Sequence, residues 1–261
     1  EGATRTISEK EADTLRVGVD LGTSSIVLAV VDAGGQPVYG AFEYAQAVRD
    51  GLVVDYVGAV TITRRLKAKA EAELGCSLTK AAAAVPPGTL GKNKDVVSHV
   101  LEGADFEVTA IYDEPTAAAL VLDMVNGAVV DVGGGTTGIT VIKRRKVSYT
   151  ADEPTGGSHM TLVLSGNYGI SQADAELLKR DHSREREVYP VIRPVVEKMA
   201  TITNKALTDG AYRKNGPVYV VGGATNFTDF ADTFEKVIGR EVIKPLYPEF
   251  VTPLGIALGS V

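Results

Sequence analysis

The sequence contains a single cysteine, Cys76, and no tryptophan. One cysteine excludes an intrachain disulfide framework and a cysteine-ligated metal cluster. Histidines are also few, and His99, His159 and His182 are scattered along the chain without the spacing of metal ligands. A metal centre built on cysteine or histidine is therefore not expected.

Long apolar runs and long basic runs are missing as well. Glycines and charged residues interrupt every apolar stretch before it reaches the length of a membrane span. The first residues, EGATRTISEKEADT, have no apolar signal-peptide core and are typical of a charged, flexible tail over residues 1–14. The net charge is −6, and the basic run Lys143–Lys146 is too short to suggest a phosphate-backbone-binding surface. We expect a cytoplasmic protein that binds neither a membrane nor nucleic acid.

A repeated pattern stands out in what remains. Residues 17–31 read VGVDLGTSSIVLAVV and residues 129–142 read VVDVGGGTTGITVI, so a strand, a loop of small and hydroxyl residues, and a second strand occur twice. The chain has 261 residues, 44% of them hydrophobic, which is enough for two small lobes. The repeat predicts a duplicated α/β architecture with two lobes around one cleft, over residues 15–127 and 128–261.

Periodicity and turn signals predict the other elements. Strands are expected at Val38–Tyr44, Lys80–Val85, Phe106–Tyr112 and Val218–Val221, and helices at Val60–Leu74, Lys92–Glu102, Pro115–Asn126, Gln172–Asp181, Val191–Leu207, Thr228–Ile238 and from Ile256. The charged run KRDHSRERE, residues 179–187, is typical of a solvated connection between helices. A partner-docking site is the alternative interpretation of this run.

The second loop, Gly133–Gly138, formally matches the dinucleotide-binding pattern G-x-G-x-x-G. That pattern requires a helix after the glycines, whereas the β-branched run Ile139–Ile142 predicts a strand. A P-loop is excluded because no Gly-Lys-Ser or Gly-Lys-Thr occurs. What remains is a β-hairpin whose tip exposes backbone N–H groups, which can approach phosphate oxygens closely. A plain hairpin turn is the alternative for either loop by itself.

Asp20 and Asp131 each end an apolar strand at the mouth of a loop. A carboxylate there is poorly placed for packing and well placed for a cation. Because Mg²⁺ is often held by a few carboxylates together with substrate phosphates and waters, two such aspartates are consistent with a metal–phosphate site. An aspartate that hydrogen-bonds its own turn is the alternative.

Glu114 lies where a predicted strand gives way to a helix with Pro115 in its first turn. A carboxylate at a helix N-terminus is favourable by itself, so a helix-capping role is one interpretation. The other is that Glu114 orients a water molecule for attack on a γ-phosphate, since phosphoryl transfer to water depends mainly on positioning and charge neutralisation.

Five segments carry a family resemblance. DLGTSS, EPTAAA, DVGGGTTG and VYVVGGATN occur in the order of the phosphate-one, connect-one, phosphate-two and adenosine motifs of the superfamily of actin, DnaK-type chaperones and sugar kinases, and PLGIALGSV is similar to its second connecting segment. The resemblance covers nearly all of the chain after the tail. It implies an actin-like ATPase fold, with two ribonuclease-H-like lobes around a nucleotide cleft and a C-terminal helix packing back at the lobe junction.

The resemblance also implies roles for individual residues, with Mg²⁺ and ATP or ADP as cofactors. It assigns Asp20 and Asp131 to the hydrated Mg²⁺ and to catalysis, and Glu114 to the nucleophilic water. The phosphate contacts fall to Gly22, Thr23, Ser24, Gly134, Gly135 and Thr136. The adenosine side of the site comprises Gly222, Gly223 and Asn226, with Gly156 and Gly157 nearby.

The chain departs from the chaperone pattern at three places. Gly138 stands where the chaperones usually carry a second aspartate, and Asn226 stands where they carry an arginine beside the adenine. The outer subdomains are reduced or missing, in the first lobe between Val31 and Lys80 and in the second lobe after Lys179. No counterpart of the chaperones' catalytic lysine is found in the trimmed first-lobe segment, and their peptide-binding domain has no counterpart in this sequence.

In closer detail the sequence resembles a small DnaK-like family encoded with bacterial ethanolamine-catabolism genes. That resemblance implies a chaperone-like or reactivation-type protein with weak Mg-dependent ATP hydrolysis coupled to lobe closure. It implies a protein client, ethanolamine ammonia-lyase or another ethanolamine-utilisation protein, and a cytoplasmic location that includes association with a bacterial microcompartment. A non-hydrolysing assembly or scaffold module, such as an actin-like polymer, is the alternative, and a small-molecule kinase is a further one.

Overall fold

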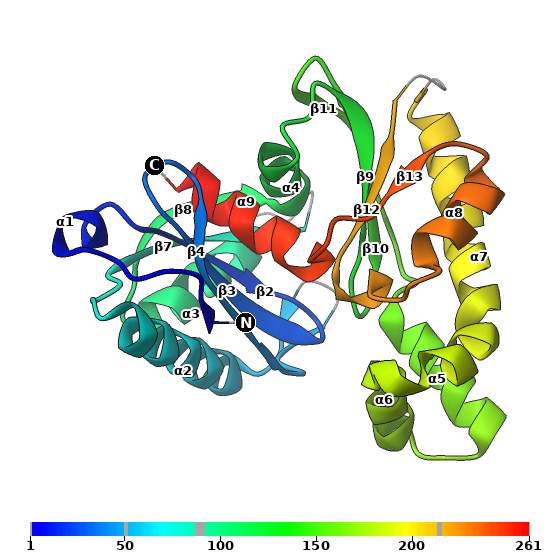
Figure 1. Ribbon diagram of the computed structural model, residues 1–261, viewed down its shortest axis with the longest axis horizontal. Helices are drawn as coiled ribbons and strands as arrows, with labels where there is room; N and C mark the ends of the chain where they lie inside the picture. Colours follow the sequence, from blue (N-terminus) through cyan, green and yellow to red (C-terminus); the bar gives the residue numbers. More distant parts are fainter. Residues whose placement is uncertain (1, 50–51, 87–91, 213–215, 261) are drawn as a thin grey trace. The chain divides into compact units, whose positions relative to one another are not determined.

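The computed structural model describes residues 2–49, 52–86, 92–212 and 216–260. The chain divides into two compact units: unit 1 is Glu1–Met124 with Phe250–Val261, and unit 2 is Val125–Glu249 (Figure 1). The sequence predicts a boundary at 127/128 and a C-terminal helix that packs back at the lobe junction. In the structure this helix belongs to unit 1, because it packs on the helix and strands of that unit described below.

Unit 1 is built on a six-stranded mixed sheet with the strand order β1-β4-β3-β2-β7-β8. Strands β2, β7 and β8 are parallel to one another, and β3 and β4 form an antiparallel meander with β2. A small hairpin, β5 with β6, stands apart from this sheet. The elements are β1 (Gly2–Ala3), α1 (Glu9–Ala12), β2 (Arg16–Leu21), β3 (Ser25–Val31), β4 (Pro37–Tyr44), β5 (Val48–Arg49), β6 (Leu52–Val53), α2 (Tyr56–Leu74), β7 (Lys80–Val85), α3 (Lys92–Gly103), β8 (Glu107–Asp113), α4 (Glu114–Val121) and α9 (Val251–Gly259).

The predicted flexible tail is partly structured. Gly2 pairs with Gly40 of β4, and the backbone N–H of Ala3 donates to Glu73 Oε2 at 2.9 Å. Helix α1 begins with a capping box in which the N–H of Ser8 donates to the Glu11 carboxylate at 3.0 Å. The contacts involve a few residues only, and hydrophobic periodicity does not predict them.

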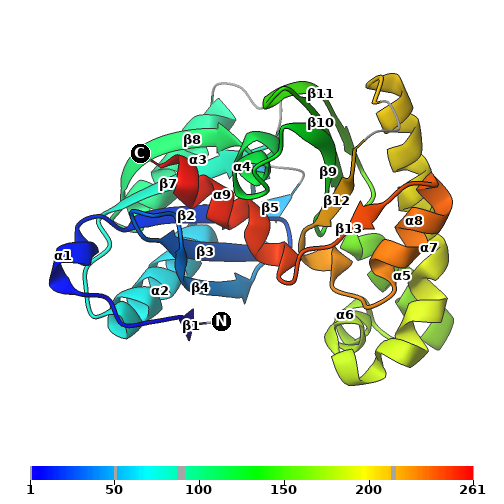
Figure 2. The same cartoon turned by 45° about the horizontal axis from the view of Figure 1, so that its top comes forward.

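Helices cover both faces of the first sheet. Helices α2 and α3 lie on one face, and α4 and α9 lie on the other (Figures 1 and 2). The first face is lined by large side chains such as Leu28 and Leu66, whereas the second is lined by small ones, including Ala82 and Ala84. Side chains alternate between the faces of a strand, so alanines placed every second residue along β7 let α4 and α9 approach closely.

The contact between α4 and α9 is very close at Gly255. A Cβ atom at this position would lie 1.8 Å from the carbonyl oxygen of Ala117. Gly18 of β2 is similarly restricted, since its Cβ would lie 2.2 Å from Pro253 O. Both neighbours are backbone atoms, which cannot rotate away, so the two glycines set the distance between α9 and the rest of unit 1.

We expect Gly255→Ala to destabilise the protein by about 3 kcal/mol, because overpacking against backbone forces α4 and α9 apart. The measurement is the urea midpoint of unfolding. Gly166→Ala, within helix α5 (Gly157–Tyr168), is the control, because its Cβ would meet no atom within 4 Å. That change should stabilise by about 0.5–1 kcal/mol through helix propensity. An unchanged midpoint for Gly255→Ala would contradict the close helix contact.

Unit 2 repeats the topology of unit 1. Its five-stranded sheet has the order β11-β10-β9-β12-β13, and five strands of the first sheet have the order β4-β3-β2-β7-β8. If the strands of each set are numbered along the chain, both sheets have the order 3-2-1-4-5. In both sheets the first three strands are antiparallel and the last two are parallel to the first. The elements are β9 (Asn126–Val132), β10 (Thr137–Lys143), β11 (Lys146–Glu153), α5, α6 (Gln172–Arg180), η1 (His182–Arg184), α7 (Glu185–Asp209), β12 (Val218–Val221), η2 (Gly223–Thr225), α8 (Phe230–Ile238), β13 (Val242–Ile243) and η3 (Pro248–Phe250).

A single large core holds unit 2 together. Helices α5, α7 and α8 bury Met160, Ile192, Met199 and Phe230 against the sheet. The charged run 179–187 connects two helices, as predicted, and is itself largely helical, since it ends α6, forms η1 and begins α7. Helix α7 therefore starts six residues before the predicted Val191.

Candidate functional site

In unit 1, the parallel strands β2, β7 and β8 end at one edge of the sheet. Val19 pairs with Ala83, and Val85 pairs with Asp113, so Asp20 at the end of β2 and Glu114 after β8 both lie at this edge. In sheets of this kind, ligands bind outside the carboxyl ends of the parallel strands. Asp20 and Glu114 are thus placed where a ligand site is expected.

The first predicted phosphate loop, Gly22-Thr23-Ser24, is the turn that joins β2 to β3. Leu21 pairs with Ile26 across the hairpin, and a Cβ on Gly22 would lie 2.9 Å from Ser25 O. The turn therefore needs glycine for steric reasons alone. Its three residues are partly exposed, so their backbone and hydroxyl groups can be reached from solvent.

Helix α4 is capped by Asp113, not by Glu114. The Asp113 carboxylate accepts from the backbone N–H of Thr116 at 3.0 Å and from Thr116 Oγ1 at 2.9 Å. Glu114 is the first helical residue and still benefits from the positive end of the helix. The neighbouring aspartate supplies the side-chain cap, and a favourable charge at the helix N-terminus stays one interpretation of Glu114.

In unit 2, β9 and β12 bring Asp131 and Gly222 together. The strands are parallel, and Val221 pairs with Asp131. Gly222 has φ of 91°, and a Cβ there would lie 2.4 Å from Asp131 Oδ1 and 2.5 Å from Val132 O. Only a glycine leaves room for this carboxylate at the strand end, so the start of the adenosine motif and the predicted metal ligand form one local arrangement.

The second phosphate loop is a β-hairpin tip, as the sequence predicts. Val132 pairs with Thr137, and strand β10 follows where a dinucleotide-binding fold would require a helix. The backbone N–H of Gly133 donates to Thr136 O at 3.0 Å. Within the described residues, the N–H groups of Gly134, Gly135 and Thr136 have no hydrogen-bond acceptor. Successive unpaired amides of this kind form an anion-binding concavity.

Gly156 and Gly157 support this loop from behind. The N–H of Gly157 donates to Gly133 O at 2.9 Å, and the N–H of Ser158 donates to Gly134 O at 2.8 Å. A Cβ on Gly156 would lie 2.8 Å from the carbonyl oxygens of both Gly133 and Gly134. The N-terminus of α5 therefore holds the shape of the loop by donating hydrogen bonds to its carbonyl groups. The amides of Gly134, Gly135 and Thr136 take no part in these bonds.

A buried ion pair beneath α5 escapes sequence analysis. Lys179 Nζ donates to Gly157 O at 3.0 Å, to Thr161 Oγ1 at 2.9 Å and to Glu176 Oε2 at 2.6 Å. An ammonium group has three donors, so all of them are used. In the sequence, Glu176 and Lys179 resemble any exposed i,i+3 pair of a helix, and only the packing of α6 against α5 reveals their role.

Burial and charge act against each other in this pair. Burial lowers the pKa of Lys179, and the charge of Glu176 opposes that effect. Burial alone would raise the pKa of Glu176, but the charge of Lys179, with hydrogen bonds from Lys179 and Thr161, holds it below the usual value. A carboxylate with a lowered pKa in the folded state stabilises the protein above its ordinary pKa, and this stability is lost as the pH falls through the folded-state value.

We therefore expect Glu176→Gln to lower stability by about 2–3 kcal/mol at pH 7, because it leaves a mostly buried lysine without its counter-charge. The difference from wild type should shrink in acid, where Glu176 is protonated. Urea unfolding at several pH values provides the measurement. Glu187→Gln is the control, since its pair with Arg184 is about half exposed on both sides, and its effect should stay within about 0.5 kcal/mol. Equal effects of the two variants would contradict the buried-pair interpretation.

Asn226 is already engaged in the structure. Its Nδ2 donates to Glu249 Oε2 at 3.0 Å, and the backbone N–H of Gly222 donates to Pro248 O at 2.9 Å. Two hydrogen bonds thus join the adenosine-motif turn to the segment after β13. Gly223, at the start of η2, is exposed.

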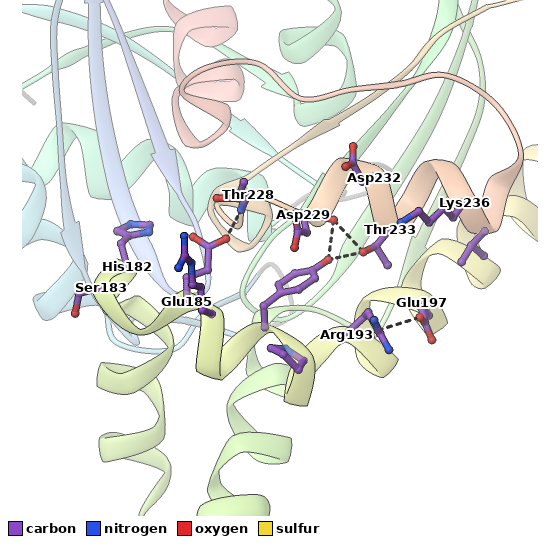
Figure 3. Close-up of a pocket in the computed structure, with 14 residues that line it drawn as sticks. His182, Ser183, Glu185, Arg193, Glu197, Thr228, Asp229, Asp232, Thr233 and Lys236 are labelled. Atoms are coloured by element: carbon purple, nitrogen blue, oxygen red, sulfur yellow. Dashed lines mark hydrogen bonds and ion pairs between the residues drawn. The ribbon is translucent and has the colours of Figure 1, made fainter.

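A groove of about 840 Å³ lies elsewhere on unit 2, between the first half of α7 and helix α8 (Figure 3). Tyr189 lines it, and its hydroxyl donates to Asp229 O at 2.9 Å and contacts Thr233 Oγ1 at 2.6 Å. Burial raises the pKa of Tyr189 to about 12. None of the predicted site residues lines this groove. Part of the charged run lines the groove. Docking of a partner at this run stays a prediction.

The described residues form neither a metal-binding cluster nor a membrane-spanning helix. They contain no cluster of three or more His, Cys, Asp or Glu side chains that could hold a metal ion. Across residues 2–49, 52–86, 92–212 and 216–260, no helix is both long and apolar enough to cross a membrane.

Two family models and a relative at 43% identity match this chain. The family model of cell division protein FtsA matches residues 128–255, and that of Hsp70 protein matches residues 50–164. The ethanolamine utilization protein EutJ of Escherichia coli strain K12 is 43% identical over 244 residues, covering 93% of this chain and 85% of that protein.

Two solved structures extend the comparison. The crystal structure of EutJ from Carboxydothermus hydrogenoformans has a TM-score of 0.90 and 52% identity, covering 94% of this chain and 89% of that one. The PilM-PilN type IV pilus biogenesis complex gives a TM-score of 0.78 at 15% identity, covering 94% and 98%, and this likeness concerns the fold alone. The expected actin-like ATPase fold is thus confirmed, and the chain belongs to the EutJ family of ethanolamine utilization proteins.

Proposed function

We propose that the chain is a nucleotide-binding, chaperone-like protein of ethanolamine utilisation that holds Mg-ATP or Mg-ADP. The observation that carries the proposal is the arrangement at Asp131. There a carboxylate, a turn with three successive unpaired amides, and a glycine that leaves room for the carboxylate lie at the carboxyl edge of one sheet. The matches to Hsp70 and EutJ proteins support the same interpretation.

The residues fit roles that a bound nucleotide would need. Asp131 and Asp20 would hold a hydrated Mg²⁺, which neutralises phosphate charge when bound. The amides of Gly134, Gly135 and Thr136, and the turn Gly22-Thr23-Ser24, would bind phosphate oxygens. Gly222 and Gly223 would let the backbone approach the adenosine, with Asn226 beside it, whereas Gly156 and Gly157 would act by holding the loop in place.

Isothermal titration of the whole protein with ADP tests the proposal. In excess Mg²⁺ we expect saturable binding, and the affinity should fall when EDTA replaces the metal, because uncompensated phosphate charge then faces the two aspartates. Adenosine, which lacks phosphates, should bind far more weakly. No binding of ADP or ATP in the presence of Mg²⁺ would overturn the assignment.

The chaperone-like activity forms the less direct part of the proposal. Weak ATP hydrolysis coupled to closure of the two lobes would act on a protein client, with ethanolamine ammonia-lyase the first candidate from the family context. Recovery of inactivated ammonia-lyase with this protein and ATP, compared with ADP, measures that activity. Nucleotide-dependent polymers without recovery would favour the assembly module instead, and phosphorylation of a small molecule would favour a kinase.

A further inference from the structure

The segment between β13 and η3 presents two apolar side chains to solvent. Leu246 is 83% exposed and Tyr247 is 64% exposed, and Pro245 and Pro248 flank them. Prolines restrict the backbone, so the pair is displayed on a stiff segment. Single exposed apolar residues are common and need no explanation by themselves. The surroundings of this segment give Tyr247 a specific role.

The segment belongs to the edge of the sheet that carries the candidate site. Strand β13 is parallel to β12, and Tyr219 pairs with Ile243, so the chain leaves β13 at the same edge at which β12 ends. Lys244 Nζ donates to Thr225 O at 3.3 Å, which ties one end of the segment to the adenosine-motif turn. The Gly222–Pro248 and Asn226–Glu249 hydrogen bonds tie the other end to the same turn. Residues 244–249 are thus fastened at both ends to the turn proposed to receive the nucleoside.

A base bound at this turn would be held by stacking on a planar side chain, and the chain offers one. Asn226 has a neutral amide in place of the planar guanidinium that an arginine would stack on the base, and this amide already donates to Glu249. Phe227 and Phe230, which follow the turn, are buried in the core of unit 2. Among the described residues of this edge, Tyr247 is the exposed aromatic ring.

We propose that Tyr247 is the stacking platform for the purine base of the nucleotide. This inference rests on the proposed nucleotide binding and adds the group that holds the base. Stacking on an aromatic ring depends on the π-face and not on the hydrogen-bonding edge of the base, so it tolerates different bases. ATP and GTP should consequently bind with affinities within about tenfold of each other.

The absence of tryptophan from the sequence provides a direct probe. Tyr247→Trp introduces a single indole whose fluorescence reports this position alone. We expect Mg-ADP to quench it, because the base stacks on the ring, whereas magnesium pyrophosphate, which has no base, should bind and leave the emission unchanged. Quenching of equal size by both ligands, or by neither while ADP binds, would overturn the proposal.

Affinities of a second set of variants complete the test. Tyr247→Ala should weaken Mg-ADP binding about tenfold or more and leave pyrophosphate binding unchanged. Tyr247→Phe should keep the affinity for both ligands. Leu246→Ala, on the adjacent exposed side chain, is the matched control and should also keep both affinities. Unchanged ADP affinity in Tyr247→Ala would overturn the stacking role and leave nucleotide binding standing. Loss of both ligands in Tyr247→Ala would show a structural role instead, and no ADP binding by the wild-type protein would overturn both proposals.

Discussion

Replacing Asp131 by alanine is expected to weaken Mg-ADP binding about a hundredfold or more, a change of about 2.7 kcal/mol. Asp131 ends β9 beside Gly222, and its carboxylate occupies the space that a side chain at 222 would fill. Without it, Mg²⁺ loses an anionic oxygen ligand on the side of the three unpaired loop amides. Isothermal titration of the variant against the wild-type protein, both in excess Mg²⁺, gives the ratio.

Two further variants separate loss of charge from loss of fold. Asp131→Asn keeps the shape of the side chain and removes the charge, so its affinity should fall nearly as far while its urea midpoint stays close to that of the wild type. Asp209→Asn removes an exposed carboxylate at the end of α7 and should change neither quantity. If Asp131→Ala folds and binds Mg-ADP as the wild type does, Asp131 is a turn-capping residue and the metal assignment is wrong.

A substitution at Gly222 tests the position of the Asp131 carboxylate independently. Gly222→Ala would push a methyl group into Asp131 Oδ1 and Val132 O, at a φ of 91° that L-residues rarely adopt. The substitution is costly because Val132 O belongs to the strand backbone and the φ value strains any side chain at this position. A loss of affinity here with Asp131 intact would indicate that the position of the carboxylate matters, as well as its charge.

The sequence predicts the two β-hairpins well because each is local. An apolar strand, an aspartate and a glycine turn are adjacent in the chain, so a hairpin with Asp20 or Asp131 at its base follows from composition and spacing alone. The equal strand order of the two sheets then follows from the repeat. Helix α4 is also predicted, although it ends at Val121, five residues before the expected Asn126.

The elements that escape prediction depend on distant contacts or on weak propensity. Helix α5 starts at Gly157 and contains Gly166, and glycine disfavours helix, so only its packing against the phosphate loop and α7 identifies it. The grouping of α9 with unit 1 depends on Gly255 and Gly18, which fit backbone atoms of α4 and α9. The Lys179–Glu176 pair is ordinary in sequence and becomes distinctive only once α6 packs against α5.

Glu114→Gln is expected to lower the rate of ATP hydrolysis about a hundredfold, the ordinary contribution of a positioned carboxylate that accepts a proton or orients water. Asp113 supplies the side-chain cap of α4, so a change at Glu114 leaves that cap in place. The wild-type rate itself should be below about 1 s⁻¹, because no counterpart of the chaperones' catalytic lysine is found in the sequence. Lys179, a mostly buried cation that contacts Gly157 behind the loop, has all three donors occupied.

Single-turnover phosphate release, with and without ammonia-lyase, measures this rate, and Asp113→Ala supplies the matched comparison. Removing the cap should lower stability by about 1 kcal/mol and leave the rate per folded molecule nearly unchanged. Glu114→Gln should do the reverse, lowering the rate and leaving the urea midpoint in place. If both variants lost stability and neither lost rate, Glu114 would be a second helix-terminal carboxylate with no part in hydrolysis. Asp113 and Glu114 are consecutive residues at one helix N-terminus, so their variants change nearly the same surroundings. A difference in hydrolysis rate between the two variants therefore distinguishes a catalytic role from a helix-capping role.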